Sequence, residues 1–431
     1  MTEKDILPFD FQKASVKRII KVIGVGGGGG NAVKNMFREG IHDVAFALCN
    51  TDIQALAESE IPTKVQLGNT GLGAGNEPEV ACKAAEESIE QIRALFTDDT
   101  KMVFVTAGMG GGTGTGASPI IAREAKAAGM LTVGVVTIPF RFEKMPKILQ
   151  ALKGVDAIAA NVDALLVINN ERLLDIYPNM PIAQGFAKVN EILTVAVKSI
   201  AELITVHGTI NLDFCDVQKV LKDGGVAVMS YGLGKGEHRL TAAINEALHS
   251  PLLNDNDVYH SKKILFNIYQ SMEHPIYVQE LEELDQFMDE FREKDIEVIW
   301  GIANDESLDE DVKITILATG FGLSTLPGME VGEKLSTDQL NVNGDVEDSA
   351  PVSVEEESQI ELELMHPIAS DEDRVASIYG ENIHTFIFED DDLFDDILIA
   401  AVAQSPTFSR TGQDLKNLYA QSQRVAINDE F

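Results

Sequence analysis

The sequence predicts an α/β protein built on a parallel sheet with helices on both faces, and two observations support this. Apolar, β-branched runs alternate along the first half of the chain with stretches of helical periodicity. Glycine-rich loops follow several of these runs, and in such a sheet the loops at the carboxyl ends of the strands share one edge. Strands are expected at residues 18–25, 44–49, 102–107, 131–139 and 164–169.

The loop after the third expected strand is the most informative stretch. It reads Met-Gly-Gly-Gly-Thr-Gly-Thr-Gly over residues 109–116 and leads into a helical pattern over residues 117–128. Glycine at this density costs backbone entropy and adds nothing to a core, so a ligand is expected to approach the main chain closely. Backbone amides that converge at a helix start bind phosphate. A flexible linker is the alternative, but linkers are not usually set between a buried strand and an alanine-rich helix.

The first half of the chain contains two further glycine-rich loops. Residues 26–30 are all glycine and lead through Asn31 into a helical pattern, and residues 68–75 precede a helical stretch at 80–96. The spacing Gly24-x-Gly26-x-x-Gly29 also matches the dinucleotide fingerprint, with Asp52 as its candidate ribose-binding acid. The Gly-Lys-Ser/Thr ending of a Walker loop is missing, which disfavours an ordinary P-loop enzyme.

Composition excludes several classes of protein. The 431 residues are 45% hydrophobic, enough for at least two cores, and the formal net charge is −35. Such acidity excludes a protein that coats nucleic acid and disfavours direct adsorption to anionic lipid. The three cysteines lack metal-ligand spacing, and we find neither a signal peptide nor an apolar run long enough to span a membrane. We therefore expect a soluble, cytoplasmic protein without direct membrane insertion.

A long amphipathic helix is expected over residues 183–206. The stretch contains one glycine and no proline, and its apolar residues recur at helical spacing. Such a helix is long enough to join two domains as a spine, although periodicity alone leaves a plain surface helix open.

Two acids follow this helix within the segment 208–217. Asp213 and Asp216 lie three residues apart, where they could polarise a water molecule. The alternative is helix capping, in which both acids stabilise a helix start, and the residue pattern alone favours it.

The sequence after this segment predicts a second, smaller α/β domain with its own small sheet, followed by a disordered acidic tail. Strands are expected at 263–268, 297–301 and 313–318, and helices at 239–248 and 281–294. After residue 322 polar and acidic residues dominate. The predicted organisation is an N-terminal extension (1–17), a nucleotide domain (18–182), a central helix (183–207), a second domain (208–322) and the tail (323–431).

The glycine motif at 110–116 and the motif Asn-Leu-Asp-Phe-Cys-Asp-Val at 211–217 together resemble the tubulin/FtsZ GTPase family. The resemblance covers about residues 18–322. It implies a tubulin-like fold, GTP/GDP and Mg²⁺ as ligands, and head-to-tail homopolymers that form the bacterial division ring at midcell. It also implies that membrane-adaptor proteins bind the C-terminal tail.

The resemblance assigns roles residue by residue. It places the phosphates against Gly27, Gly28, Gly29, Gly30, Asn31, Gly111, Gly112, Thr113, Gly114 and Thr115, and it places Asn50 and Asp52 in the family's Asn-Thr-Asp motif. Glu143 and Lys147 would approach ribose and phosphates, and Phe186 and Asn190 would contact guanine. Asn211, Asp213 and Asp216 would complete the hydrolytic site of the neighbouring subunit, and no residue is assigned as a metal ligand.

The chain departs from the family pattern at four positions. Lys144 follows Glu143 where the family usually has glycine, and Lys147 stands in the place of an arginine. Lysine cannot make the bidentate phosphate contact of arginine, so a weaker contact is expected there. His207 replaces a frequent proline, and Cys215 replaces the usual alanine or glutamate. Two other functions stay open: a filament scaffold that binds nucleotide but hardly hydrolyses it, and an NAD-dependent oxidoreductase.

Overall fold

The computed structural model describes residues 18–322, apart from residues 42, 174–179, 207, 211, 249–257, 293 and 295. The expected N-terminal extension and the expected acidic tail therefore lie outside the described residues. The described part falls within a single compact unit, Met1–Thr325.

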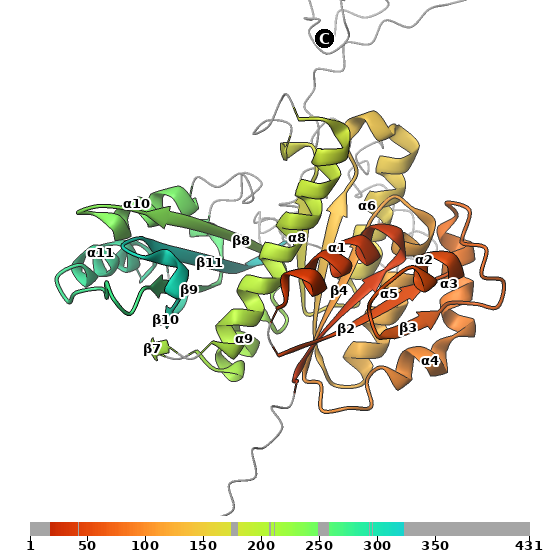
Figure 1. Ribbon diagram of the computed structural model, residues 1–431, viewed down its shortest axis with the longest axis horizontal. Coiled ribbons are helices and arrows are strands. Elements are labelled where there is room, and N and C mark those ends of the chain that lie inside the picture. Colours follow the sequence, from red (N-terminus) through yellow and green to blue (C-terminus); the bar gives the residue numbers. More distant parts are fainter. Residues whose placement is uncertain are drawn as a thin grey trace, which may run out of the picture. The chain divides into compact units, whose positions relative to one another are not determined.

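The first half of the chain forms a parallel sheet in the order β3-β2-β1-β4-β5-β6. Figure 1 shows this half on the right, where β2, β3 and β4 are labelled. All five strands expected from the sequence are present, and the short edge strand β3 is an addition. Their apolar residues are buried because helices cover the sheet. The strands are β1 (Ile20–Val25), β2 (Val44–Asn50), β3 (Thr63–Gln66), β4 (Met102–Gly108), β5 (Leu131–Ile138) and β6 (Ala164–Asn169).

Helices connect these strands. They are α1 (Gly26–Glu39), α2 (Ile53–Ala57), α3 (Pro78–Glu87), α4 (Ile89–Ala94), α5 (Gly112–Ala127) and α6 (Met145–Ala159), with a 3₁₀ turn at Arg141–Glu143. The prediction of a single helix at 80–96 is wrong, because the helix is interrupted at Ser88, between α3 and α4. The Ser88 hydroxyl accepts a hydrogen bond from the Gly68 amide at 2.8 Å. The residue at the break therefore also fixes the start of the glycine-rich loop that follows β3.

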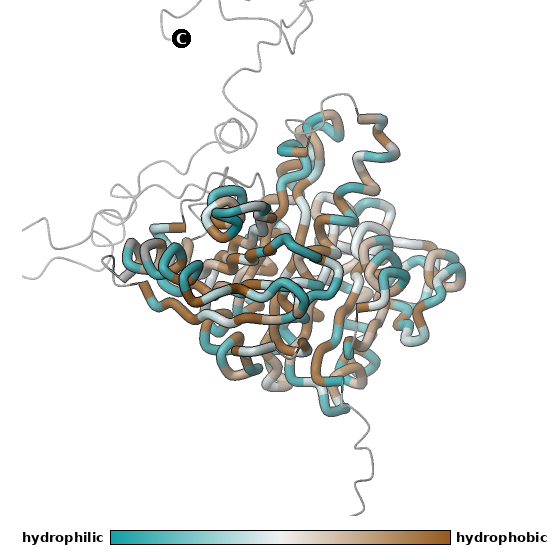
Figure 2. The backbone as a smooth tube through the Cα atoms, turned by 60° about the vertical axis from the view of Figure 1, so that its left-hand side comes forward, coloured by the Kyte–Doolittle hydropathy of each residue, from teal (hydrophilic) through white to brown (hydrophobic). Residues whose placement is uncertain are grey.

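The long central helix is confirmed as α8 (Ile182–Thr205). Its apolar face enters one hydrophobic cluster with residues from both halves of the chain, including Val133 of β5 and Leu265 and Leu317 of the second half. Figure 2 shows the hydrophobic segments running through the interior of the described part. The helix is therefore a spine between two packed layers, and the surface-helix alternative is wrong.

The second half adds five strands in the order β8-β11-β9-β10-β7. The sequence predicted a separate small sheet, but Gly225, Val226 and Ala227 of β8 pair in parallel with β6, so one eleven-stranded sheet runs through the described residues. The strands are β7 (Gly208–Ile210), β8 (Gly225–Gly234), β9 (Lys263–Gln270), β10 (Glu297–Asn304) and β11 (Val312–Phe321). The helices are α9 (Phe214–Leu221), α10 (Arg239–Leu248) and α11 (Leu281–Arg292), with 3₁₀ turns at Val258–His260 and Glu306–Leu308.

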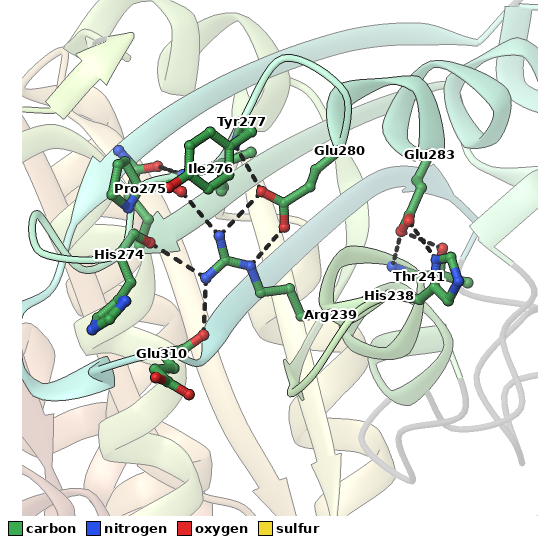
Figure 3. Close-up of polar contacts among 11 residues, drawn as sticks. His238, Arg239, Thr241, His274, Pro275, Ile276, Tyr277, Glu280, Glu283 and Glu310 are labelled. Atoms are coloured by element: carbon green, nitrogen blue, oxygen red, sulfur yellow. Dashed lines mark hydrogen bonds and ion pairs between the residues drawn. The ribbon is translucent and has the colours of Figure 1, made fainter.

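A buried arginine ties this half together (Figure 3). The Arg239 guanidinium is paired with the Glu280 carboxylate through Nε at 2.7 Å and Nη2 at 3.1 Å. It also donates to the backbone carbonyls of His274, Pro275 and Glu310. The hydrogen bond from Arg239 holds the pKa of Glu280 below its usual value. One side chain thus connects α10 with two loops that are distant in sequence.

Candidate nucleotide site

Strand register brings the glycine-rich loops to one edge of the sheet. Val25, the last residue of β1, pairs with Cys49 of β2 and with Ala107 of β4. Gly108, the last residue of β4, pairs with Thr137 near the end of β5. The carboxyl ends of these strands are therefore level, and the loops that follow them meet, as the sequence predicted.

Two of the helices that begin at this edge, α1 and α5, have no side-chain caps. Val25 precedes α1 and Gly111 precedes α5, and neither provides a side chain that accepts from the first-turn amides. The first four N–H groups of a helix have no partner within the helix. The amides at these two helix starts lack side-chain acceptors, and the positive ends of the two helix dipoles lie there. Both features favour the binding of an anion at this edge.

The glycines at this edge fall into two classes. A Cβ on Gly29 would lie 2.1 Å from the Thr106 carbonyl oxygen, and one on Gly26 would lie 2.8 Å from the Gly114 amide nitrogen. These glycines let the chain pack on itself. A Cβ on Gly27 or Gly111 would meet nothing within 4 Å. Packing does not explain glycine at these two positions, whereas close approach of a ligand to the main chain would.

A pocket of about 270 Å³, including its open mouth, lies between α1, the end of β2 and α2. Its lining includes the predicted residues Gly27, Gly30, Asn31 and Asn50, and it also includes Lys34. Cys49 lines it too, and burial raises the pKa of its thiol to about 12. The thiol therefore stays protonated at neutral pH and is no nucleophile.

Hydroxyl groups link the β2 loop to the α5 loop. The Thr51 and Thr113 hydroxyl oxygens lie 2.7 Å apart, and the Thr115 hydroxyl accepts from the Gly110 amide at 2.9 Å. Asp52 caps α2, since its carboxylate accepts from the amides of the next helix. The Asp52 carboxylate thus already has backbone partners.

Glu143 and Lys147 form an ion pair, with Nζ and Oε2 2.5 Å apart. Glu143 also accepts from the Phe140 amide at 3.0 Å. Between them Lys144 has φ 73° and ψ 157°, a region that is essentially restricted to glycine. The departure seen in the sequence is therefore a strained residue next to two predicted nucleotide contacts.

Phe186 lies in an aromatic cluster near the end of β5. Its ring meets Phe140 edge-on at a centroid distance of 5.4 Å and Phe142 at 6.4 Å, while Phe140 and Phe142 stack at 5.0 Å. Phe186 and Phe142 stay exposed by 41% and 50%. This cluster fixes the start of α8 at the same edge as the glycine loops and leaves aromatic surface free for a base.

Asp213 and Asp216 form a capping box at the start of α9. The Asp216 amide donates to Asp213 Oδ1 at 2.9 Å, and the Asp213 amide donates to Asp216 Oδ2 at 3.0 Å. The capping alternative is confirmed, and Asp213 is nevertheless exposed to solvent. Asn211 and His207 lie outside the described residues.

The acids are far from the glycine loops of the same chain. Just after α9, the Gly224 amide donates to the Asp163 carbonyl at 2.9 Å, and Asp163 precedes β6 at the amino-terminal edge of the sheet. The α8 helix, whose 24 residues span about 36 Å, separates Phe186 near its start from the acids beyond its end. The structure thus brings together the glycine, Asn50, Glu143 and Phe186 groups, but not the two acids.

Sequence reasoning missed several residues at this edge, namely Lys34, Thr51, Phe140 and Phe142. Thr51 lies between two predicted residues, and the aromatic pair flanks Arg141, so proximity in sequence to the predicted sites was the available signal. In the described part of the chain no group of three or more histidine, cysteine or acidic side chains is arranged to hold a metal ion. Among the described helices none has both the length and the apolar character to cross a membrane.

Comparison with known proteins identifies the family. The GTPase-domain model of the tubulin/FtsZ family matches residues 19–178, and the FtsZ C-terminal domain model matches residues 225–322. The chain belongs to the tubulin/FtsZ family. A further FtsZ C-terminal model matches residues 381–425 in the predicted tail.

Relatives in this family cover most of the chain. The cell division protein FtsZ of Porphyromonas gingivalis is 47% identical over 429 residues, which is 98% of this chain and 92% of that protein. The FtsZ of Wigglesworthia glossinidia brevipalpis is 40% identical over 317 residues, covering 73% of this chain and 82% of that protein. An empty FtsZ dimer of M. jannaschii superposes with a TM-score of 0.64 at 37% identity, covering 72% of this chain and 89% of the other.

A CetZ2 protofilament of Haloferax volcanii, bound to GTPγS, shares only the fold. Its TM-score is 0.59 at 19% identity, covering 70% of this chain and 94% of the other. The resemblance to the tubulin/FtsZ family inferred from the two sequence motifs is thus confirmed. The match to a GTPase domain gives no support to the oxidoreductase alternative.

Proposed function

We propose that this protein is a GTP-hydrolysing cell-division protein that polymerises head-to-tail, and that Asp213 and Asp216 of one protomer act on the GTP bound by the next. Membership of the tubulin/FtsZ family supports the GTPase and the division role. The observation that carries the trans arrangement is the separation of the acids from the glycine loops within one chain. A neighbour stacked on the glycine edge removes that separation.

The glycine edge has the groups that a triphosphate needs. The free amides at the starts of α1 and α5 would hold the phosphate oxygens, and the open space at Gly27 and Gly111 lets those oxygens approach the main chain. The exposed ring of Phe186 would stack on guanine, with Asn190 one turn further along α8 as its hydrogen-bonding partner.

The acids would act on water. In the neighbouring protomer Asp213 and Asp216 keep their carboxylates near solvent, where they can orient a water molecule in line with the γ-phosphate and accept its proton. Mg²⁺ would neutralise charge on the phosphates, and its ligands would be mainly phosphate oxygens and water. Loss of the γ-phosphate would then weaken the contact between protomers.

Mixing two defective variants tests the trans arrangement directly. Asp213→Asn keeps nucleotide binding but lacks one acid, and Gly27→Asp keeps both acids but places a carboxylate where phosphate binds. Either variant alone is expected to release little phosphate. Their equal mixture should release phosphate well above the sum of the two, because in random assembly intact acids meet bound GTP at about a quarter of the contacts. A mixture no more active than its components contradicts hydrolysis across the interface.

The scaffold alternative is favoured by the Glu143–Lys147 ion pair. The Lys147 ammonium is expected to approach the phosphates, but here it is already paired with the Glu143 carboxylate. Sedimentation and phosphate release, measured on one sample over a range of protein concentrations, distinguish the two functions. The GTPase proposal expects turnover per protomer to rise above a threshold concentration together with sedimentation. Assembly without phosphate release would establish the scaffold.

Adaptor binding through residues 323–431 and assembly at midcell belong to the same proposal as the GTPase activity.

A further inference from the structure

A chain of hydrogen bonds joins α1 to α8 through a buried hydroxyl. The Asn35 side-chain amide on α1 donates to the Thr194 hydroxyl on α8 at 3.1 Å and to Glu39 on its own helix at 3.0 Å. The Thr194 hydroxyl in turn donates to the Asn190 carbonyl at 2.8 Å. Thr194 is fully buried, so water does not compete for its hydroxyl.

This bridge lies one turn from predicted ligand contacts on both helices. Asn31 precedes Asn35 by four residues on α1, and Asn190 precedes Thr194 by four residues on α8. Residues four apart share a face of a helix. The α1 face that carries Asn31 is thus the face that contacts α8, and the α8 face that carries Asn190 is the face that contacts α1.

The two helices run in the same direction. α1 begins directly after β1 at the carboxyl edge of the sheet. The start of α8 is held at that edge, because Phe186 contacts Phe140, which lies two residues beyond β5. Asn31 and Asn190 are therefore each one turn nearer to the nucleotide edge than the bridge.

We propose that the Asn35–Thr194 hydrogen bond is a positioning contact for base selection: it sets Asn190 on α8 against the glycine loop at Asn31 on α1. The proposal rests on the proposed function, since it takes guanosine nucleotides as the ligand. Guanine presents an N1–H and a 2-amino group as donors, and a hydrogen bond to them weakens steeply when its angle changes. A small shift of α8 therefore costs base contacts while phosphate contacts to the loops persist.

Thr194→Val removes the hydroxyl and keeps the shape of the side chain. The apolar contacts of the buried position survive, but the bond across the two helices and the bond to Asn190 are lost. Thr194→Ser restores the hydroxyl. Thr205 offers a matched control, because its hydroxyl donates to the Ala201 carbonyl of the same helix at 3.0 Å. Thr205→Val thus removes a bond of the same type that lies within α8 alone.

The experiment measures the affinities of GTP and inosine triphosphate, which lacks the 2-amino group, on the full chain below its assembly threshold. Thr194→Val is expected to weaken GTP binding about tenfold and inosine triphosphate binding less than threefold, so selectivity falls. Thr194→Ser and Thr205→Val should stay within twofold of the unchanged protein for both ligands. Thermal unfolding of each variant, followed without nucleotide, reports any general loss of stability.

Equal losses for the two nucleotides in Thr194→Val, or the same loss of selectivity in Thr205→Val, would overturn the positioning role. If Thr194→Val does not fold, Asn35→Ala provides the test. It removes the donor that crosses between the helices and leaves the Thr194–Asn190 bond intact. Unchanged selectivity in Asn35→Ala also overturns the proposal. Failure of the unchanged protein to bind GTP at all would instead refute the proposed function, and the two failures are therefore distinguishable.

Discussion

The glycine edge and the start of α9 are built in opposite ways. At the glycine edge two helices begin without side-chain caps, and their first amides have no side-chain acceptor. At the start of α9, Asp213 and Asp216 satisfy each other's backbone amides. The first region presents main chain to a ligand, while the second presents carboxylates on an already completed helix turn.

The difference shows how each region relates to a ligand. An uncapped helix start gains its missing partners when an anion binds, so the glycine edge is completed by the ligand. The α9 start is complete by itself, so its acids keep their positions whether or not a neighbour is present. If the acids act on a neighbour's nucleotide as proposed, they would need no rearrangement beforehand, which suits a group supplied by a second protomer.

The largest expected effect separates capping from catalysis at Asp213. Asparagine caps helices about as well as aspartate but cannot accept a proton, so Asp213→Asn should keep thermal stability and GTP affinity while turnover falls about 10²-fold or more. Phosphate release and thermal unfolding on the same preparation check both parts. Asp213→Ala, as the comparison variant, should lose a further ~1 kcal/mol of stability with the cap. Normal turnover in Asp213→Asn would remove this acid from the mechanism.

The next effect distinguishes the two classes of glycine. A methyl group on Gly27 meets open space and alanine favours a helix, so Gly27→Ala should keep the fold and weaken GTP binding about tenfold, ~1.4 kcal/mol. Gly29→Ala should lower the free energy of unfolding by about 3 kcal/mol, because its Cβ would overlap the Thr106 carbonyl. Nucleotide titration and chemical denaturation measure the two quantities. Unchanged affinity in Gly27→Ala would argue against a ligand at that amide.

Strain at Lys144 gives the third prediction. Lys144→Gly relieves a backbone conformation that costs side-chain-bearing residues about 1–3 kcal/mol, and part of that gain is offset by the greater entropy of unfolded glycine. We expect a net gain of about 1 kcal/mol, seen as a rise of about 2 °C in the unfolding temperature. Lys144→Ala retains the strain and should show no gain. Equal stability in both variants would mean that the surrounding turn relaxes without cost.

The smallest effect concerns Lys147. Lys147→Arg provides two parallel donors, so GTP affinity should rise about threefold, ~0.7 kcal/mol, if the side chain exchanges Glu143 for phosphate. Lys153→Arg, at an exposed position on the same helix, is the control and should change nothing. A lower affinity in Lys147→Arg would indicate that the pair with Glu143 persists when nucleotide binds.

Local patterns predicted the parts of the fold that depend on neighbouring residues. The β-branched runs gave the strands, the glycines gave the edge where their loops meet, and the periodicity at 183–206 gave α8. The capping role of Asp213 was also readable, because a cap depends on residues three positions apart.

Features that depend on contacts distant in sequence were not readable. Nothing local shows that β8 continues the first sheet, because the pairing joins residues about sixty positions apart. The aromatic cluster needs α8 folded back on the end of β5 before Phe186 meets Phe140. The break at Ser88 likewise depends on its bond to Gly68 twenty residues earlier. The roles of the predicted ligand residues themselves stay predictions.

The pairing of β6 with β8, which joins the two halves of the sheet, affects how a subunit responds to tension. Strands β6 and β8 pair over three residues, whereas β4 and β5 pair over seven. In a filament, tension entering at one end of a subunit must cross this joint or pass through α8, which both halves hold by apolar packing. Side-chain packing is stiff, and a ladder of three residue pairs has few hydrogen bonds to share a load. A stretched subunit would thus part at the ladder first while the helix still carried the load.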